Sequence, residues 1–156
     1  MANSQAICTS FKAEVMLGAH QLGSVTIVSR TSLTSPTTDT LYAALYLASG
    51  SLGAGTTAYS GTSEVSGTGY SAGGIAVTNA TAPTTSGTTG YWTPSASLVY
   101  STVTLTTAFD TCLIYNSTQS NRAIGVYTFG SQTVTAGTFT LTMPTNDATH
   151  ALIQLA

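Results

Sequence analysis

Only a few residues of this 156-residue chain could carry acid–base or nucleophilic chemistry. The two histidines, His20 and His150, lie far apart in the sequence, and no spacing links either of them to a nucleophile and an orienting carboxylate, as a hydrolytic triad requires. Serine is so abundant that finding one together with a histidine and an aspartate has no diagnostic value. We therefore expect a non-enzymatic protein with no catalytic residues.

The acidic residues follow no pattern of a metal or cofactor site. Asp39, Asp110 and Asp147 fall in different predicted turns, where aspartate commonly bonds its own backbone. The chain contains no Asp-x-Asp loop, no His-Glu-x-x-His motif and no glycine-rich phosphate loop, and its only lysine is Lys12. We expect neither a metal ion nor a cofactor.

The composition is unusually poor in charge. Charged residues make up 5% of the chain and the formal net charge is -2, so no basic surface is available to neutralise the phosphates of a nucleic acid. In typical soluble proteins about a quarter of the residues are charged. Here serine and threonine, which together form about a third of the residues, must supply most of the polar surface. Because threonine suits the pleated surface of a strand, a hydroxyl-rich solvent face favours sheet over helix.

The chain begins without a basic segment followed by an apolar one, and no apolar run is long enough to span a bilayer. We expect synthesis in the cytoplasm, no membrane partner and a single domain over residues 1–156. Cys8 and Cys112 could pair if the fold brought them together, but buried reduced thiols are the commoner state without an export signal. The sequence leaves their pairing open.

One helix is predicted, over residues 4–22, because Ile7, Phe11 and Val15 recur at every fourth position. A short strand at residues 25–28 and a loop at residues 31–40 follow. Residues 41–48 predict a central strand, since leucines and tyrosines occupy opposite parities and both faces are apolar. Residues 49–74, rich in Gly, Ser and Thr, predict a long loop with short strands.

The last third predicts six strands separated by turns, at residues 98–106, 111–116, 122–129, 132–135, 138–143 and 151–155, with a hairpin turn at Ala136-Gly137. Two shorter strands are expected at residues 75–78 and 90–93. Together these elements predict a mainly β fold, an antiparallel β-sandwich that is jelly-roll-like or related, with the N-terminal helix packed on it.

Five residues are candidates for contacts with a partner. Tyr59 and Tyr70 lie in the glycine-rich loop, and aromatic residues are enriched in buried contacts between proteins. Trp92 is expected to anchor either the core or an interface. Arg30 and Arg122, the only arginines, either end solvated elements or contact a partner's carboxylate or carbonyl oxygen.

Three segments resemble one class of proteins. These are Leu41-Tyr42-Ala43-Ala44-Leu45-Tyr46, the loop from Tyr59 through Glu64 to Gly74, and the segment Ala108-Phe109-Asp110-Thr111-Cys112-Leu113-Ile114-Tyr115-Asn116 with the closing Phe139 to Pro144. The chain is similar in these segments to small β-rich virion structural proteins of tailed bacteriophages. The resemblance implies no particular residue roles.

What the resemblance implies is a capsid decoration, or cement, protein on the outside of the head, with the major capsid protein and copies of itself, as a trimer or dimer, as partners. Many copies on a symmetric shell gain from multivalency, so each contact can be modest. The alternative is a tail or adhesin module that binds a host surface glycan through loop aromatics such as Tyr70 and Trp92.

Overall fold

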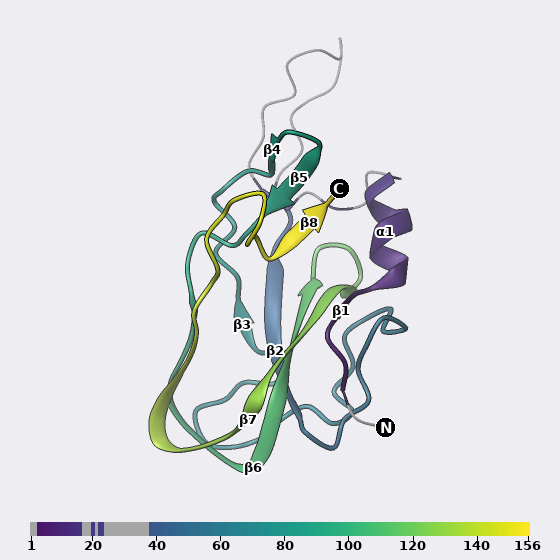
Figure 1. The fold of residues 1–156 in the computed structure, drawn as a ribbon. Coiled ribbons are helices and arrows are strands. Elements are labelled where there is room, and N and C mark those ends of the chain that lie inside the picture. The colour runs from purple at the N-terminus through teal and green to yellow at the C-terminus, as the bar shows by residue number, and fades with distance from the viewer. Residues whose placement is uncertain (1–2, 17–19, 21, 24–37) are drawn as a thin grey trace.

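The structure is a computed structural model, and it describes residues 3–16, 20, 22–23 and 38–156. The described chain is mainly β, with two antiparallel sheets and one short N-terminal helix, which confirms the predicted class and is consistent with a β-sandwich (Figure 1). The larger sheet has the strand order β1-β7-β6-β2-β3, and the smaller has the order β4-β5-β8. The elements are β1 (Ala6–Ile7), α1 (Thr9–Met16), β2 (Leu41–Leu47), β3 (Ile75–Ala76), β4 (Thr84–Ser86), β5 (Thr89–Trp92), β6 (Leu98–Asn116), β7 (Arg122–Leu141) and β8 (Ile153–Leu155).

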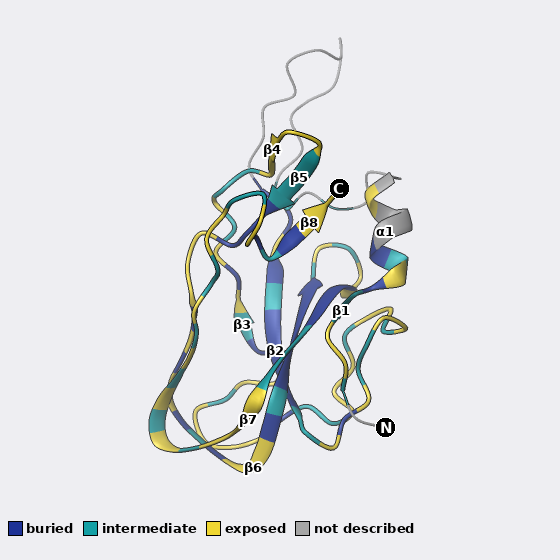
Figure 2. Cartoon of the chain, viewed as in Figure 1, coloured by how far each residue is buried: buried dark blue, intermediate teal, exposed yellow. Residues whose placement is uncertain are grey.

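Strand β2 is central, as predicted. It pairs with β6 along one side from Leu41 to Leu47 and with β3 on the other. Most of its residues are buried, because its alternating leucines and tyrosines are covered on both faces. Figure 2 shows the buried residues gathered along β2 and the adjoining parts of β6 and β7. The predicted positions of β3 and β5 are also confirmed, with bounds that differ by one or two residues.

The last third contains fewer and longer strands than predicted. The first two predicted segments form the single strand β6, and the next three form the single strand β7. The turns predicted inside β6 and inside β7 are instead bulges or irregularities at which the register of the β6–β7 pair shifts while the pairing continues, whereas the turn predicted between residues 116 and 122 is confirmed. Ala136-Gly137 is such a place and not a hairpin turn: Ala136 has a φ of 45°, and its amide donates to Thr104 Oγ1 at 3.0 Å.

The β6–β7 hairpin folds back on itself. Phe139 pairs with Tyr100, which lies nine residues before Phe109 in β6. A straight strand of nine residues would span roughly 30 Å, yet the Phe139 and Phe109 ring centroids are 5.0 Å apart in an edge-to-face contact. The part of the hairpin that contains Tyr100 and Phe139 therefore packs against the part that contains Phe109. Figure 1 shows this bend at the end of the molecule away from β8.

The bend also brings the hairpin over β2. The Tyr100 hydroxyl donates to the carbonyl oxygen of Ala43 at 2.8 Å, and this bond is buried. Tyr100 is a core residue, as are Leu98, Val103 and Leu105 on the same strand. The two halves of one bent hairpin thus enclose much of the core from opposite sides.

The N-terminal helix is shorter than predicted. Residues 6 and 7 form strand β1 on the edge of β7, and α1 begins at Thr9 and not at residue 4. The Cys8 amide also donates to a β7 carbonyl, that of Ile124, at 3.1 Å. These residues gain cross-strand partners that the first turn of a helix would lack. The predicted strand at residues 25–28, most of the loop at residues 31–40, and Arg30 lie outside the described residues.

The two cysteines are buried and do not form a disulfide. Cys8 directly precedes α1, and Cys112 lies in β6. Both side chains are part of the hydrophobic core. Burial is the main cause that raises the pKa of the Cys112 thiol, to about 12.

Candidate interaction surfaces

The long loop between β2 and β3 is organised around one carboxylate, Glu64. The Tyr59 hydroxyl donates to Glu64 Oε2 at 2.7 Å, and the Tyr70 hydroxyl donates to Oε1 at 2.8 Å. The amide of Gly73 also donates to Oε1, at 2.7 Å. Charge-assisted hydrogen bonds of this kind are stronger than neutral ones. Glu64 therefore ties together three parts of a loop that has almost no regular secondary structure.

Backbone contacts fix the same loop along the edge of β2. Leu47 donates to Ser63 O at 2.9 Å, and Val65 donates to Leu45 O at 3.0 Å. The amide of Leu45 donates to the Tyr70 hydroxyl at 3.0 Å. Thus the backbone of β2 that faces away from β6 is covered by loop residues.

Glycine is required where the loop returns to β3. Gly74 has a φ of 78°, and a Cβ atom there would collide with the carbonyl of Ala43. The hydroxyl of Tyr115, in β6, donates a hydrogen bond to Gly73 O at 2.9 Å. These contacts fix the end of the loop that leads into β3.

The tyrosines of this loop have altered acidity. Burial is the largest cause that raises the pKa of Tyr59, to about 12, and its hydrogen bond to the Glu64 carboxylate adds to the effect. Burial and the same carboxylate raise the pKa of Tyr70 well above its usual range. Both phenols are thus protonated donors at neutral pH, as the Glu64 contacts require.

Three of the five predicted contact residues lie in this region. Tyr59 and Tyr70 share Glu64, and Tyr59 donates its amide to Asn121 O at 2.9 Å. The residue before Tyr59, Ala58, forms a β-bridge with Arg122, which is exposed at the start of β7. We call the surface formed by residues 56–64 and Arg122 the loop face. Whether it contacts a partner stays a prediction.

Trp92 lies elsewhere, in the core. Its side chain is 1% exposed, and its indole nitrogen donates to Thr81 O at 2.8 Å. The core interpretation is confirmed. One side of the ring lines an apolar groove of about 340 Å³ between α1 and the smaller sheet. Because Trp92 is buried, its ring is not presented as an open platform for a sugar. Tyr70 is partly buried, and its ring stacks on that of Tyr100 with centroids 6.0 Å apart.

A polar cluster that the sequence did not predict lies beside this groove. Asn116 Nδ2 donates to Asp39 Oδ2 at 2.6 Å and lies 3.0 Å from His20 Nδ1. Asn116 and Asp39 are buried, and the His20 ring packs on Phe11 with centroids 4.9 Å apart. Asn116 is 77 positions from Asp39 and 96 positions from His20 in the sequence, so no local spacing could have revealed the cluster.

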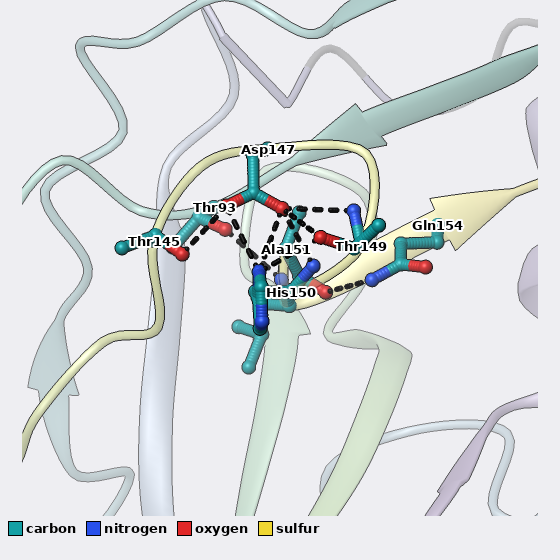
Figure 3. A network of polar contacts seen from close by, with 8 residues as sticks. Thr93, Thr145, Asp147, Thr149, His150, Ala151 and Gln154 are labelled. Carbon is teal, nitrogen blue, oxygen red and sulfur yellow. Dashed lines mark hydrogen bonds and ion pairs between the residues drawn. The ribbon is translucent and has the colours of Figure 1, made fainter. Parts of the chain in front are cut away.

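His150 belongs to a different network, in the turn before β8 (Figure 3). Its Nδ1 lies 2.9 Å from Asp147 Oδ1, and its amide donates to the same oxygen at 2.8 Å. Thr149 donates to Oδ1 through both its amide and its hydroxyl, and Thr145 donates to Oδ2. These bonds hold the pKa of Asp147 well below its usual range, with the Thr149 hydroxyl as the largest cause. The predicted turn role of Asp147 is confirmed.

The described residues contain no group of three or more His, Cys, Asp or Glu side chains that could hold a metal ion. Within the same part of the chain, no helix is long and apolar enough to cross a membrane.

No protein-family model, curated protein or solved structure matches the chain. The surfaces described above must therefore be interpreted from their own residues. Of these, the loop face combines exposure with a fixed conformation. The groove beside Trp92 is lined mainly by apolar side chains, and the Asp147 turn uses its carboxylate within the turn itself.

Proposed function

We propose that this chain is a capsid decoration protein of a tailed bacteriophage, which binds outside the major capsid protein lattice and stabilises the head without catalysing a reaction. The observation that carries the proposal is the loop face, a surface fixed in advance by Glu64 and by the edge of β2. The resemblance of the sequence to small phage virion proteins supports the choice of partner.

A fixed loop is suited to binding a rigid lattice. A flexible loop loses conformational entropy when it binds, whereas a loop already held in place loses little. Here Glu64 is the only charged residue between β2 and β3, and its carboxylate accepts three hydrogen bonds within the loop. The contact with the shell would thus depend on hydroxyl and backbone hydrogen bonds and on apolar burial, with Arg122 as a nearby cation.

Binding of this kind should depend only weakly on the salt concentration. Interactions between exposed charges weaken as ionic strength rises, but hydrogen bonds and apolar contacts are much less affected. We expect the protein to remain on particles in moderate salt. Release in moderate salt would contradict the proposed mode of binding.

The experiment compares virions with and without the gene. Cryo-electron microscopy should show density for the chain at regular positions on the head, and particles that lack it should lose their DNA at lower temperature. If the chain is found only along the tail, or if its deletion abolishes host adsorption while leaving head stability unchanged, the tail or adhesin alternative replaces the proposal.

A pair of variants tests the loop face. Thr57→Lys places a charge on an exposed residue of that face, and Thr85→Lys places the same charge on exposed β4. We expect Thr57→Lys to weaken binding to purified shells at least tenfold and Thr85→Lys to leave it unchanged. Equal effects of the two variants would count against the loop face as the contact surface.

A further inference from the structure

Strand β7 has a long edge that the described chain leaves uncovered. Strand β1 pairs only with Gly125 and Val126, and the Gln5 side chain reaches as far as Thr128. Beyond that point, β6 is the only described strand that pairs with β7. Most residues from Gly130 to Thr140 are exposed. The edge of β2, by contrast, is covered by the loop and by tyrosine hydroxyls.

The uncovered edge has little of the protection usual in single-chain proteins. Exposed edges are commonly guarded by charged side chains, prolines or bulges. No Asp, Glu, Lys, Arg or His occurs between Arg122 and Asp147, and the first proline after Arg122 is Pro144. The bulge at Ala136 interrupts the edge, and the register of the β6–β7 pair shifts again beside Thr138. From Phe139 to Leu141, where β7 ends, the pairing is regular, and Thr142 follows directly.

The side chains of this segment alternate. Thr138, Thr140 and Thr142 are exposed, while Phe139 and Leu141 face the core and are only partly buried. On the outer face Thr140 is paired with Val99, which is 47% exposed and is one of three large hydrophobic residues that the described chain exposes. The edge therefore presents a row of hydroxyls on one face and partly uncovered apolar side chains on the other.

We propose that two copies of this chain pair through Thr138–Thr142, antiparallel and about a twofold axis at Thr140, so that the larger sheets become continuous. In this register Thr140 faces its own copy and Thr138 faces Thr142 of the other copy. Phe139 and Leu141 of the two copies become neighbours on the core side. Two identical edges without charge have no electrostatic repulsion to overcome, and twofold pairing of one patch with itself closes the assembly at two.

The inference does not depend on the proposed function, because it concerns the isolated chain. Analytical ultracentrifugation over a concentration series should show a reversible dimer. Thr140→Lys places two lysines opposite each other across the axis, so we expect the dimer dissociation constant to rise at least tenfold. Thr106→Lys, on an exposed residue of β6, is the matched control and should leave it unchanged. Equal circular dichroism spectra and melting temperatures would show that both variants fold.

The register is tested by charge exchange. Thr138→Lys with Thr142→Lys places lysine opposite lysine twice and should abolish the dimer. Thr138→Lys with Thr142→Glu places lysine opposite glutamate twice and should restore it to within a few-fold of the parent. If the two double variants behave alike, the register is wrong.

Crosslinking identifies the occupant of the edge. Thr140→Cys should form a crosslinked dimer with a short thiol–thiol reagent, whereas Thr107→Cys, on exposed β6, should not. Cys8 and Cys112 are buried and do not interfere. A chain that stays monomeric at every concentration, a dimer insensitive to Thr140→Lys, or a Thr140→Cys product formed only with a different protein would overturn the proposal.

Discussion

The Tyr70 hydroxyl lies 2.8 Å from Glu64 Oε1 and makes the carboxylate the fixed point of the loop between β2 and β3. We predict that Glu64→Ala destabilises the protein by about 2 kcal/mol, because partly buried donors that bonded a charged group lose their partner. Tyr59→Phe, which removes one of the bonds, should cost about 1 kcal/mol. Urea unfolding measures both values. Equal stability of Glu64→Ala and the parent protein would mean that the carboxylate does not hold the loop.

The hydroxyl groups of Tyr100 and Tyr127 are both buried, but their removal should have opposite effects on stability. The Tyr100 hydroxyl donates to Ala43 O at 2.8 Å, whereas the Tyr127 hydroxyl is buried and has no hydrogen-bond partner among the described residues. We predict that Tyr100→Phe costs about 1–3 kcal/mol, since the buried carbonyl loses its donor. Tyr127→Phe should be neutral or stabilising, because it removes an unsatisfied polar group. Thermal and urea unfolding of the two variants compare them directly; a larger loss in Tyr127→Phe would contradict the argument.

The elements that sequence predicted well are those with local patterns. Residues 41–48 carry apolar side chains on both faces, and this pattern is sufficient to identify a central strand such as β2. The boundaries of β6 and β7 were wrong because a bulge and a turn use similar residues, as at Ala136-Gly137. Only the pairing with the neighbouring strand distinguishes the two, and the sequence of one strand does not contain that information.

The sites were harder to predict than the strands. The sequence places Glu64 in a loop, but nothing in its spacing from Tyr59 and Tyr70 indicates that both hydroxyls meet its carboxylate. The interactions of Asn116 with Asp39 and His20 depend on the folded sheet. The helix start was misplaced for the same reason, because β1 exists only through its pairing with β7.

The Cys112 thiol should be unreactive in the folded protein. Burial raises its pKa to about 12, so the thiol is protonated near pH 8 and very little of the nucleophilic thiolate is present. In a Cys8→Ala background, where Cys112 is the only thiol, we predict negligible alkylation by iodoacetamide until denaturant is added. Mass spectrometry of quenched samples measures the rate. Alkylation of the native protein at the rate of the unfolded one would show that the thiol is accessible.

The turn before β8 should lose its hydrogen bonds only in strong acid. The pKa of Asp147 is lowered from its ordinary value of 3.8 in the folded state, chiefly by the Thr149 hydroxyl and amide. A lowered folded pKa means that the stabilisation is fully present above the unfolded pKa and is lost as the pH falls toward the folded one. We predict that the Thr149 and His150 amides stay protected from hydrogen exchange as the pH falls through 3.8, the ordinary pKa of aspartate, and lose protection only in stronger acid. In Asp147→Asn the protection should be weaker and should not change over this range beyond the intrinsic exchange rate. A midpoint for the parent at or above the ordinary value of 3.8 would contradict the role of the threonine donors.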